Sequence, residues 1–243
     1  AFGLREAVVV PEPASAALVN KSIGVAAGMY ITDCLTDDMS IGVGWGATLY
    51  ESLQTLAPRQ LENVQVVSLL GGIVQARRYN PAEFAWQFAR VVGADCYLLT
   101  APAVVDSPET KEALIERCGL RDVLRRAERL DMALLSVGNM APDSTAFRFG
   151  FNSEEERTEL MRLGAVGDIL YNFYDGNGVL VDHPLNSRVM SIPLEQLRGV
   201  PSRIIASGGH EKVDSILGAI KLVNCNVLIT NEATARELLL RRS

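Results

Sequence analysis

Eight short apolar runs recur along the chain, separated by segments with helical periodicity. Several of the runs are apolar at every position, which is typical of strands covered on both faces. We expect strands at 6–10, 40–43, 64–70, 96–100, 132–137, 168–173, 203–207 and 226–230. We expect helices at 14–35, 48–56, 82–92, 108–129, 154–163, 211–222 and 232–241. This alternation predicts an α/β fold, with a mostly parallel Rossmann-like sheet and helices on both faces.

The length of 243 residues suits one large α/β domain with a small additional α+β insertion. The first residues, AFGLREAVVVPEP, carry too short an apolar run for a signal peptide and are expected to begin with a strand, as in a piece cut from a longer protein. No stretch approaches the roughly 20 apolar residues that span a bilayer, so no membrane partner is expected.

Charge and cysteine usage exclude several classes of function. The 23 Lys and Arg residues against 29 Asp and Glu give a net charge of −6, which disfavours a nucleic-acid-binding module. The four cysteines lack C-x-x-C spacing and are expected to be free thiols in a reducing cytosol. The two histidines have no neighbour at metal-ligand spacing, so neither a zinc site nor a cofactor is expected.

The stretch IGVGWGATL at 41–49 joins a strand to a helix through glycines. Gly44 and Gly46 allow a sharp turn, and the helix N-terminus with the Thr48 hydroxyl suits a phosphate or carboxylate. The alternative is a purely structural turn that binds no ligand, in which the Trp45 side chain fills the space by hydrophobic packing. A lone glycine-rich turn does not decide between the two.

The stretch SLLGGIVQARRYN repeats the pattern one strand later. Gly71 and Gly72 follow the strand, and Gln75 and Arg77 come next; such groups can hold hydroxyls and phosphate oxygens. The alternative places the arginines in solvent.

The stretch GDILYNFYDGNG contains a carboxylate at the start of an apolar strand. Asp168 there either caps local backbone or accepts hydrogen bonds from ligand hydroxyls. The glycines alone explain the turn that follows.

The stretch IIASGGHEKVDSILGAI ends a strand at Ser207 and begins a helix near Glu211. Lys212 lies in the first helical turn, where the partial positive charge of the helix dipole disfavours a cation. This position is easier to understand if the ammonium binds an anion beside Gly208 and Gly209. A solvated surface lysine is the alternative.

Two glycine-rich turns that could bind an anion, with cationic side chains nearby, favour a small phosphorylated or polyhydroxylated ligand. No G-x-G-x-x-G opens a helix after the first strand, and no G-x-x-x-x-G-K-[ST] loop occurs, so a dinucleotide or a P-loop nucleotide is disfavoured.

These stretches together resemble the C-terminal sugar-binding, or effector-binding, domain of SorC-family bacterial transcriptional regulators, which has a sugar-phosphate isomerase/deaminase-like fold. The matching pieces run in family order over almost the whole chain: FGLREAVVV, GVGWGATL, VVSLLGG, GDILYNFYDGNG, RVMSIPLEQLRGVPSRIIASGGHEKVDSILGAI and VLITNEATARELL.

The resemblance implies a cytoplasmic regulator in which residues 1–243 bind an effector and mediate assembly into homodimers or homotetramers. DNA contact would come only from an N-terminal helix-turn-helix domain outside this sequence. The effector would be a sugar, a polyol or a sugar phosphate. The implied ligand-binding residues, together with those singled out above, are Gly44, Trp45, Gly46, Ala47, Thr48, Gly71, Gly72, Gln75, Arg77, Asp168, Gly208, Gly209, Lys212 and Glu232.

One departure from the family pattern is Asn231, where the family usually has Asp. The same fold keeps a sugar-phosphate isomerase or deaminase open as an alternative, since such enzymes need a positioned acid and base. The segment LLSVGNMAPDSTAFRFG, which corresponds to the deaminase site, has Asp143 as its one acid and no histidine. His183 lies in an expected turn, and His210 stands alone beside the fourth stretch. We therefore expect a sensor that binds without turnover, not an enzyme.

A structural domain without a ligand is the third possibility, but it would leave Lys212 and the glycine turns without a reason.

Overall fold

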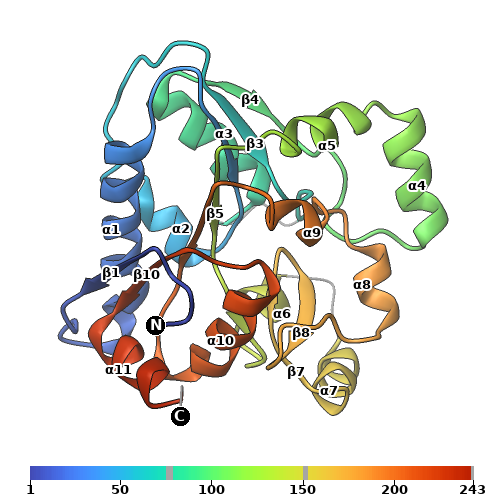
Figure 1. Ribbon diagram of the computed structural model, residues 1–243. Helices are drawn as coiled ribbons and strands as arrows, with labels where there is room; N and C mark the ends of the chain where they lie inside the picture. Colours follow the sequence, from blue (N-terminus) through green and yellow to red (C-terminus); the bar gives the residue numbers. More distant parts are fainter. Residues whose placement is uncertain (75–78, 150–152, 242–243) are drawn as a thin grey trace.

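The computed structural model describes residues 1–74, 79–149 and 153–241. Its main sheet is parallel throughout, in the order β1-β10-β9-β5-β2-β3-β4 (Figure 1). Along the sheet, the strands are β1 (Glu6–Val10), β10 (Val227–Asn231), β9 (Ser202–Ala206), β5 (Met132–Leu135), β2 (Ser40–Val43), β3 (Gln65–Ser68) and β4 (Asp95–Tyr97). A second sheet is antiparallel and consists of β6 (Gly138–Asn139), β7 (Ala165–Ile169) and β8 (Asn172–Asp175).

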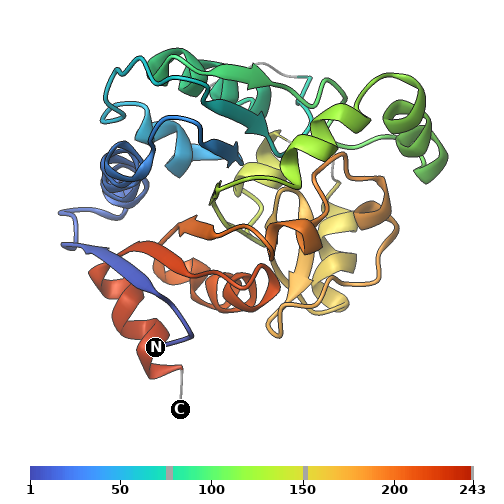
Figure 2. The same cartoon turned by 45° about the horizontal axis from the view of Figure 1, so that its top comes forward.

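Helices follow most strands and cover both faces of the main sheet (Figure 2). They are α1 (Val19–Cys34), α2 (Ala47–Ser52), α3 (Pro81–Val92), α4 (Pro108–Arg117), α5 (Arg121–Ala127), α6 (Thr145–Phe149), α7 (Glu154–Arg162), α8 (Pro184–Arg188), α9 (Leu194–Leu197), α10 (Val213–Leu222) and α11 (Glu232–Leu240). Two 3₁₀ turns, η1 (Ala16–Leu18) and η2 (His210–Lys212), precede α1 and α10.

Two apolar cores lie on opposite faces of the main sheet, because successive side chains of a strand point to opposite sides. In β9, Ile204 belongs to the core that also contains residues of α1 and α3, whereas Ile205 belongs to the other core, which contains residues of α5, α10 and the small sheet. Burial on both faces explains why these strands are apolar at every position. The expected α/β fold with a small α+β addition is confirmed.

The close packing of α1 on α2 depends on two glycines. A Cβ at Gly24 would lie 2.3 Å from the Thr48 carbonyl oxygen, and one at Gly28 would lie 2.2 Å from that of Ser52. Neither distance is compatible with a side chain, so the two backbones touch directly.

Two expected elements differ from the observed ones. The expected helix at 108–129 is broken into α4 and α5 by Gly119, whose φ is +80°. The expected strand at 168–173 is a tight antiparallel hairpin, which turns through Leu170 and Tyr171 at positive φ of 50° and 65°. Asp168 therefore lies on the small sheet and not on the main one.

The four cysteines are free thiols, as expected. Within the described ranges no helix is long and apolar enough to cross a bilayer, and no group of three or more His, Cys, Asp or Glu side chains could hold a metal.

Candidate effector cavity

A cavity of about 420 Å³ lies beyond the carboxyl ends of β2, β5 and β9. The chain passes from β2 to β3 on one side, while β5 and β9 lie on the other side of β2. Loops that leave neighbouring strands in opposite directions open a crevice at such a point, and ligands of open α/β sheets bind there.

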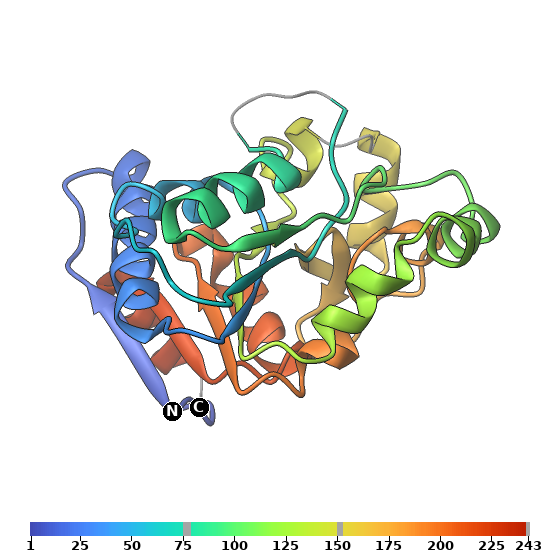
Figure 3. The same cartoon turned by 90° about the horizontal axis from the view of Figure 1, so that it is seen from above.

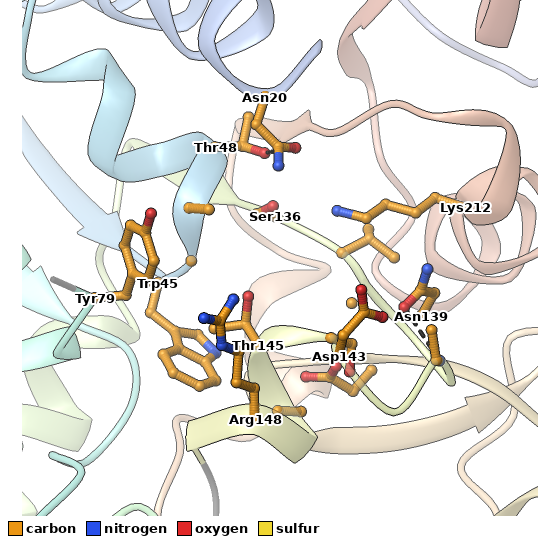
Figure 4. A pocket seen from close by; sticks show the side chains of 18 of the residues that line it. Asn20, Trp45, Thr48, Tyr79, Ser136, Asn139, Asp143, Thr145, Arg148 and Lys212 are labelled. Carbon is orange, nitrogen blue, oxygen red and sulfur yellow. Dashed lines mark hydrogen bonds between the residues drawn. The ribbon is translucent and has the colours of Figure 1, made fainter. Parts of the chain in front are cut away.

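The turn between β2 and α2 forms one wall of the cavity. Gly46 has a φ of +123°, which disfavours any residue with a side chain. Thr48 is buried and donates from Oγ1 to Oδ1 of Asn20 at 2.9 Å. Within the described residues this leaves the Asn20 amide group without an acceptor, at the first turn of α1 (Figure 4).

Lys212 reaches the cavity from η2, after β9. Its side chain points towards Ser136, into the space enclosed by the lining residues (Figure 4). In the described part of the chain its ammonium forms no hydrogen bond and no ion pair within 4 Å. Burial lowers the pKa of this ammonium, while the charges of Glu211 and Asp168 oppose the change.

Asp168 lines the same cavity from β7 and is only 3% exposed. Its Oδ2 accepts the Tyr171 N–H at 3.1 Å. Burial raises the pKa of its carboxyl from an ordinary 3.8 to about 6, against the opposing effects of the Tyr171 N–H and the Lys212 charge. The group can therefore accept hydrogen bonds when charged and donate one when protonated.

The segment after β5, residues 136–148, forms the wall opposite α2. It contributes hydroxyls, an amide and a guanidinium, and the Arg148 side chain extends towards the cavity in Figure 4. The Ser144 hydroxyl is buried and has no hydrogen-bond partner among the described residues. Alternating hydroxyl, amide and charged groups of this kind match the many donors and acceptors of a sugar.

Six of the residues predicted from the sequence line this one cavity: Trp45, Gly46, Ala47, Thr48, Asp168 and Lys212. Residues of the first and fourth glycine-rich stretches and Asp168 therefore lie around the same cavity. Trp45 is also 5% exposed and stacks on Tyr171 with 5.7 Å between ring centroids, so it belongs to the core and to the cavity wall at once.

Four of the predicted glycines donate their backbone N–H groups to the protein itself. The acceptors of Gly44, Gly71 and Gly72 are backbone carbonyls, at 2.8 Å in each case. Gly209 donates to the Thr234 hydroxyl, also at 2.8 Å. These four N–H groups bind the protein itself, which corrects our expectation that they hold the ligand.

The remaining predicted residues lie elsewhere. A Cβ at Gly208 would lie 2.3 Å from Oδ1 of Asn231, so this glycine allows close packing. Glu232 forms an ion pair with Arg236 on α11 and does not line the cavity. Gln75 and Arg77 lie outside the described residues.

Residues 1–240 match the family described as "Putative sugar-binding domain". The chain is 32% identical over 240 residues to the deoxyribonucleoside regulator of Bacillus subtilis (strain 168), a match that covers 98% of this chain and 76% of that protein. The chain belongs to this sugar-binding family.

Two further similarities place the sugar-binding domain among the SorC-type transcriptional regulators. It is 30% identical over 247 residues to the sorbitol operon regulator of Klebsiella pneumoniae, covering 99% of this chain and 77% of that protein. The crystal structure of full-length SorC from the same organism superimposes with a TM-score of 0.89 at 29% identity, over 98% of this chain and 77% of that one. The predicted family and effector-sensing role are confirmed.

Several lining residues of the sugar-binding domain were not predicted from the sequence. They are Asn20, Tyr79, Ser136, Asn139, Asp143, Ser144, Thr145 and Arg148. A signal existed for most of them, because the polar segment after Leu135 follows a buried strand and must open at the same edge as the glycine turns. Asn20 gave no local signal, since it meets Thr48 only through the packing of α1 on α2.

Proposed function

We propose that the cavity between α2, η2 and the 136–148 segment binds a sugar, a polyol or a sugar phosphate, and that this ligand is the effector of the regulator. The observation that carries the proposal is the Lys212 ammonium, which lies inside the cavity without an ion-pair partner among the described residues, beside the carboxyl of Asp168. An anionic group on the ligand would supply the missing partner, and hydroxyl groups would satisfy Asn20 and Ser144.

The effector would act by population shift. A ligand that contacts loops from several strands favours the arrangement in which those loops are close together. In the assembled regulator, a homodimer or homotetramer in the cytoplasm, this preference would change the geometry of the DNA-binding modules. The names of two relatives, the deoxyribonucleoside regulator and the sorbitol operon regulator, support a small hydroxylated effector.

Binding without turnover is part of the proposal. The two histidines of the chain lie outside the cavity: His183 accepts the Leu185 N–H at the start of α8, and the exposed His210 contacts Glu237. The names of the relatives, all regulators, support the same conclusion. If turnover occurred, NMR of the ligand mixture would show product.

A panel of sugars, polyols and their phosphates tests the proposal. Binding to the native state raises the melting temperature by mass action, and calorimetry then gives the affinity. Lys212→Met should weaken a phosphorylated ligand by roughly 10- to 100-fold, because a hydrogen bond to a charged group contributes about 1.5–3 kcal/mol. Lys221→Met is the matched control, since that ammonium donates to the Gly176 carbonyl outside the cavity. A panel in which no member shifts the melting temperature would refute the proposal.

A further inference from the structure

Polar groups from three separate segments form a chain of hydrogen bonds that ends at the turn carrying Lys212. The exposed Glu12 carboxylate, which follows β1, accepts from Nδ2 of Asn231 through Oε2 at 2.6 Å. Oδ1 of Asn231 accepts from the Thr234 hydroxyl at 2.7 Å. The Thr234 oxygen in turn accepts the Gly209 N–H at 2.8 Å. The chain therefore connects the protein surface at Glu12 with the residues directly before Lys212.

The pairing of β1 with β10 brings the members of this chain together. The two strands are parallel neighbours, and Val10 pairs with Asn231 at their carboxyl ends. The N- and C-terminal parts of the protein accordingly lie side by side at this edge of the main sheet in all three views (Figure 3). Glu12 follows Val10 by two residues, so its carboxylate reaches over the end of β10, where it also accepts the Ala233 N–H at 3.1 Å.

The direction of each hydrogen bond in the chain is fixed by its neighbours. An ionised carboxylate only accepts, so the Asn231 amide directs its NH₂ group to Glu12 and its oxygen to Thr234. The Thr234 hydroxyl has one hydrogen, which it donates to Asn231, and its lone pairs remain for the Gly209 N–H. Asn231 and Thr234 are only 1% and 0% exposed, so water does not replace a lost partner. Removing one member would leave buried polar groups unpaired, which is costly.

The turn that carries Lys212 packs directly against this chain. Gly209 has a φ of +112°, and its carbonyl accepts the Lys212 N–H at 3.0 Å. A Cβ at Gly208 would lie 2.3 Å from Oδ1 of Asn231, so the backbone of the turn touches the amide. Lys212 lines the cavity, whereas Asn231 is not among the described residues that line it. The amide therefore contacts the support of the ammonium and not the space for the ligand.

We propose that Asn231 and Thr234 are positioning residues for the Lys212 ammonium, and that Glu12 anchors them. The proposal deepens the proposed function, and it rests on that function only in assigning Lys212 to the effector. Groups that bind a ligand must be held within about 0.5 Å of their productive positions, so effector affinity depends on a surface carboxylate outside the cavity. By linkage, an effector bound to Lys212 stabilises the contact between Glu12 and Asn231 to the same extent.

Amide hydrogen exchange followed by NMR tests the chain in the ligand-free protein, with the Gly209 N–H as the reporter. Thr234→Val removes the acceptor and should speed this exchange by about tenfold or more, whereas Thr234→Ser keeps the hydroxyl and should leave the exchange slow. Glu12→Ala, at an exposed position, should also speed the exchange. Glu83→Ala is the matched control, since Glu83 is an exposed carboxylate that accepts from Gln87 on α3. Thermal melting of each variant verifies that the fold is intact.

A change of charge at positions 12 and 231 tests the contact between them. Asn231→Asp places two carboxylates together where the hydrogen bond was, and should speed Gly209 exchange by about 10- to 100-fold. Glu12→Gln alone should have little effect, because its amide oxygen can accept as the carboxylate does. The double variant should return the exchange to within about threefold of wild type, since the Gln amide donates to the new carboxylate. A merely structural role of either residue would not produce this recovery.

Two further measurements connect the chain to Lys212 itself. The NMR shift of the Lys212 Cε, assigned by its loss in Lys212→Met, should change in Asn231→Asp and return in the double variant with Glu12→Gln. Calorimetry with inorganic phosphate as the probe should show the same pattern. Phosphate should bind about tenfold more weakly to Asn231→Asp and should regain wild-type affinity in the double variant.

Equal Gly209 exchange in Thr234→Val and Thr234→Ser, or a double variant no better than Asn231→Asp, would overturn the proposal. So would a Lys212 signal that stays unchanged while the Gly209 exchange is accelerated. If phosphate bound neither wild type nor any variant, that result would count against an anionic effector and so against the proposed function. The exchange rates and the Lys212 signal are measured without ligand, so they decide the positioning role separately.

Discussion

Replacing Asp168 by Asn should stabilise the ligand-free domain while weakening effector binding. The carboxyl is buried, and burial raises its pKa from 3.8 to about 6, so the folded state disfavours the charge that the group carries at neutral pH. A tenfold change in proton affinity corresponds to about 1.4 kcal/mol, so this rise amounts to about 3 kcal/mol. Asn keeps an oxygen that can accept the Tyr171 N–H and removes the charge.

The sign of the pH dependence follows from linkage. The folded-state pKa lies above the unfolded one, so the folded state binds the proton more tightly, and wild-type stability falls as the pH rises from about 4 to about 6. Well below pH 3.8 the carboxyl is protonated in both states, and Asp and Asn should be equivalent. Above pH 6 the variant should be more stable by up to about 3 kcal/mol.

Urea unfolding at pH 4 and at pH 7.5 measures this difference. Asp143→Asn is the matched control, because Asp143 lines the same cavity but is exposed and should show no gain. An Asp168→Asn variant no more stable than wild type at pH 7.5, or equally stabilised at both pH values, would refute the reasoning. A ligand from the panel that binds the variant as tightly as wild type would show that Asp168 does not contact it.

Two further predictions concern glycines at close contacts, and a third concerns the pair of His210 and Glu237. Gly138→Ala should lower effector affinity at least tenfold in calorimetry, because its Cβ would lie 2.0 Å from Oδ1 of Asp168 and must displace it. Gly24→Ala should destabilise the fold by about 1–3 kcal/mol in urea, because overpacking against α2 outweighs the higher helix propensity of alanine. The pKa of His210, raised chiefly by its hydrogen bond to Glu237, should fall towards its ordinary value in Glu237→Gln when followed by NMR.

Gly176→Ala is the control for both glycine variants, since nothing lies within 4 Å of a Cβ built there. If Gly138→Ala or Gly24→Ala behaved like this control, the contact assigned to that glycine would be wrong. An unchanged His210 titration in Glu237→Gln would mean that the pair does not form in solution.

The main sheet could be predicted from the sequence because burial on both faces leaves an unmistakable pattern of uninterrupted apolar residues. The small sheet could not, because its hairpin turns through Leu170 and Tyr171, residue types that give no turn signal. The apolar run across 168–173 therefore resembles one continuous strand.

The candidate site was predicted where local sequence carries the chemistry. Thr48 and Lys212 were found because each follows a glycine turn at the end of a strand. Asn20 was not, because its position depends on how α1 packs against α2, 28 residues later in the chain. Gly71 and Gly72 show the converse error, since glycines that permit close backbone contact look the same in a sequence as glycines that bind an anion.

The bare contact of α1 with α2 has a mechanical consequence. Side chains between two helices can change rotamer and absorb a displacement, but backbones in direct contact cannot. A displacement of the Thr48 end of α2 should therefore move α1 with it, because no side chain lies between the two backbones at Gly24 and Gly28 to absorb it. Through Gly24 and Gly28, α1 and α2 should therefore move as one rigid unit, which lines the cavity on one side and is exposed to solvent on the other.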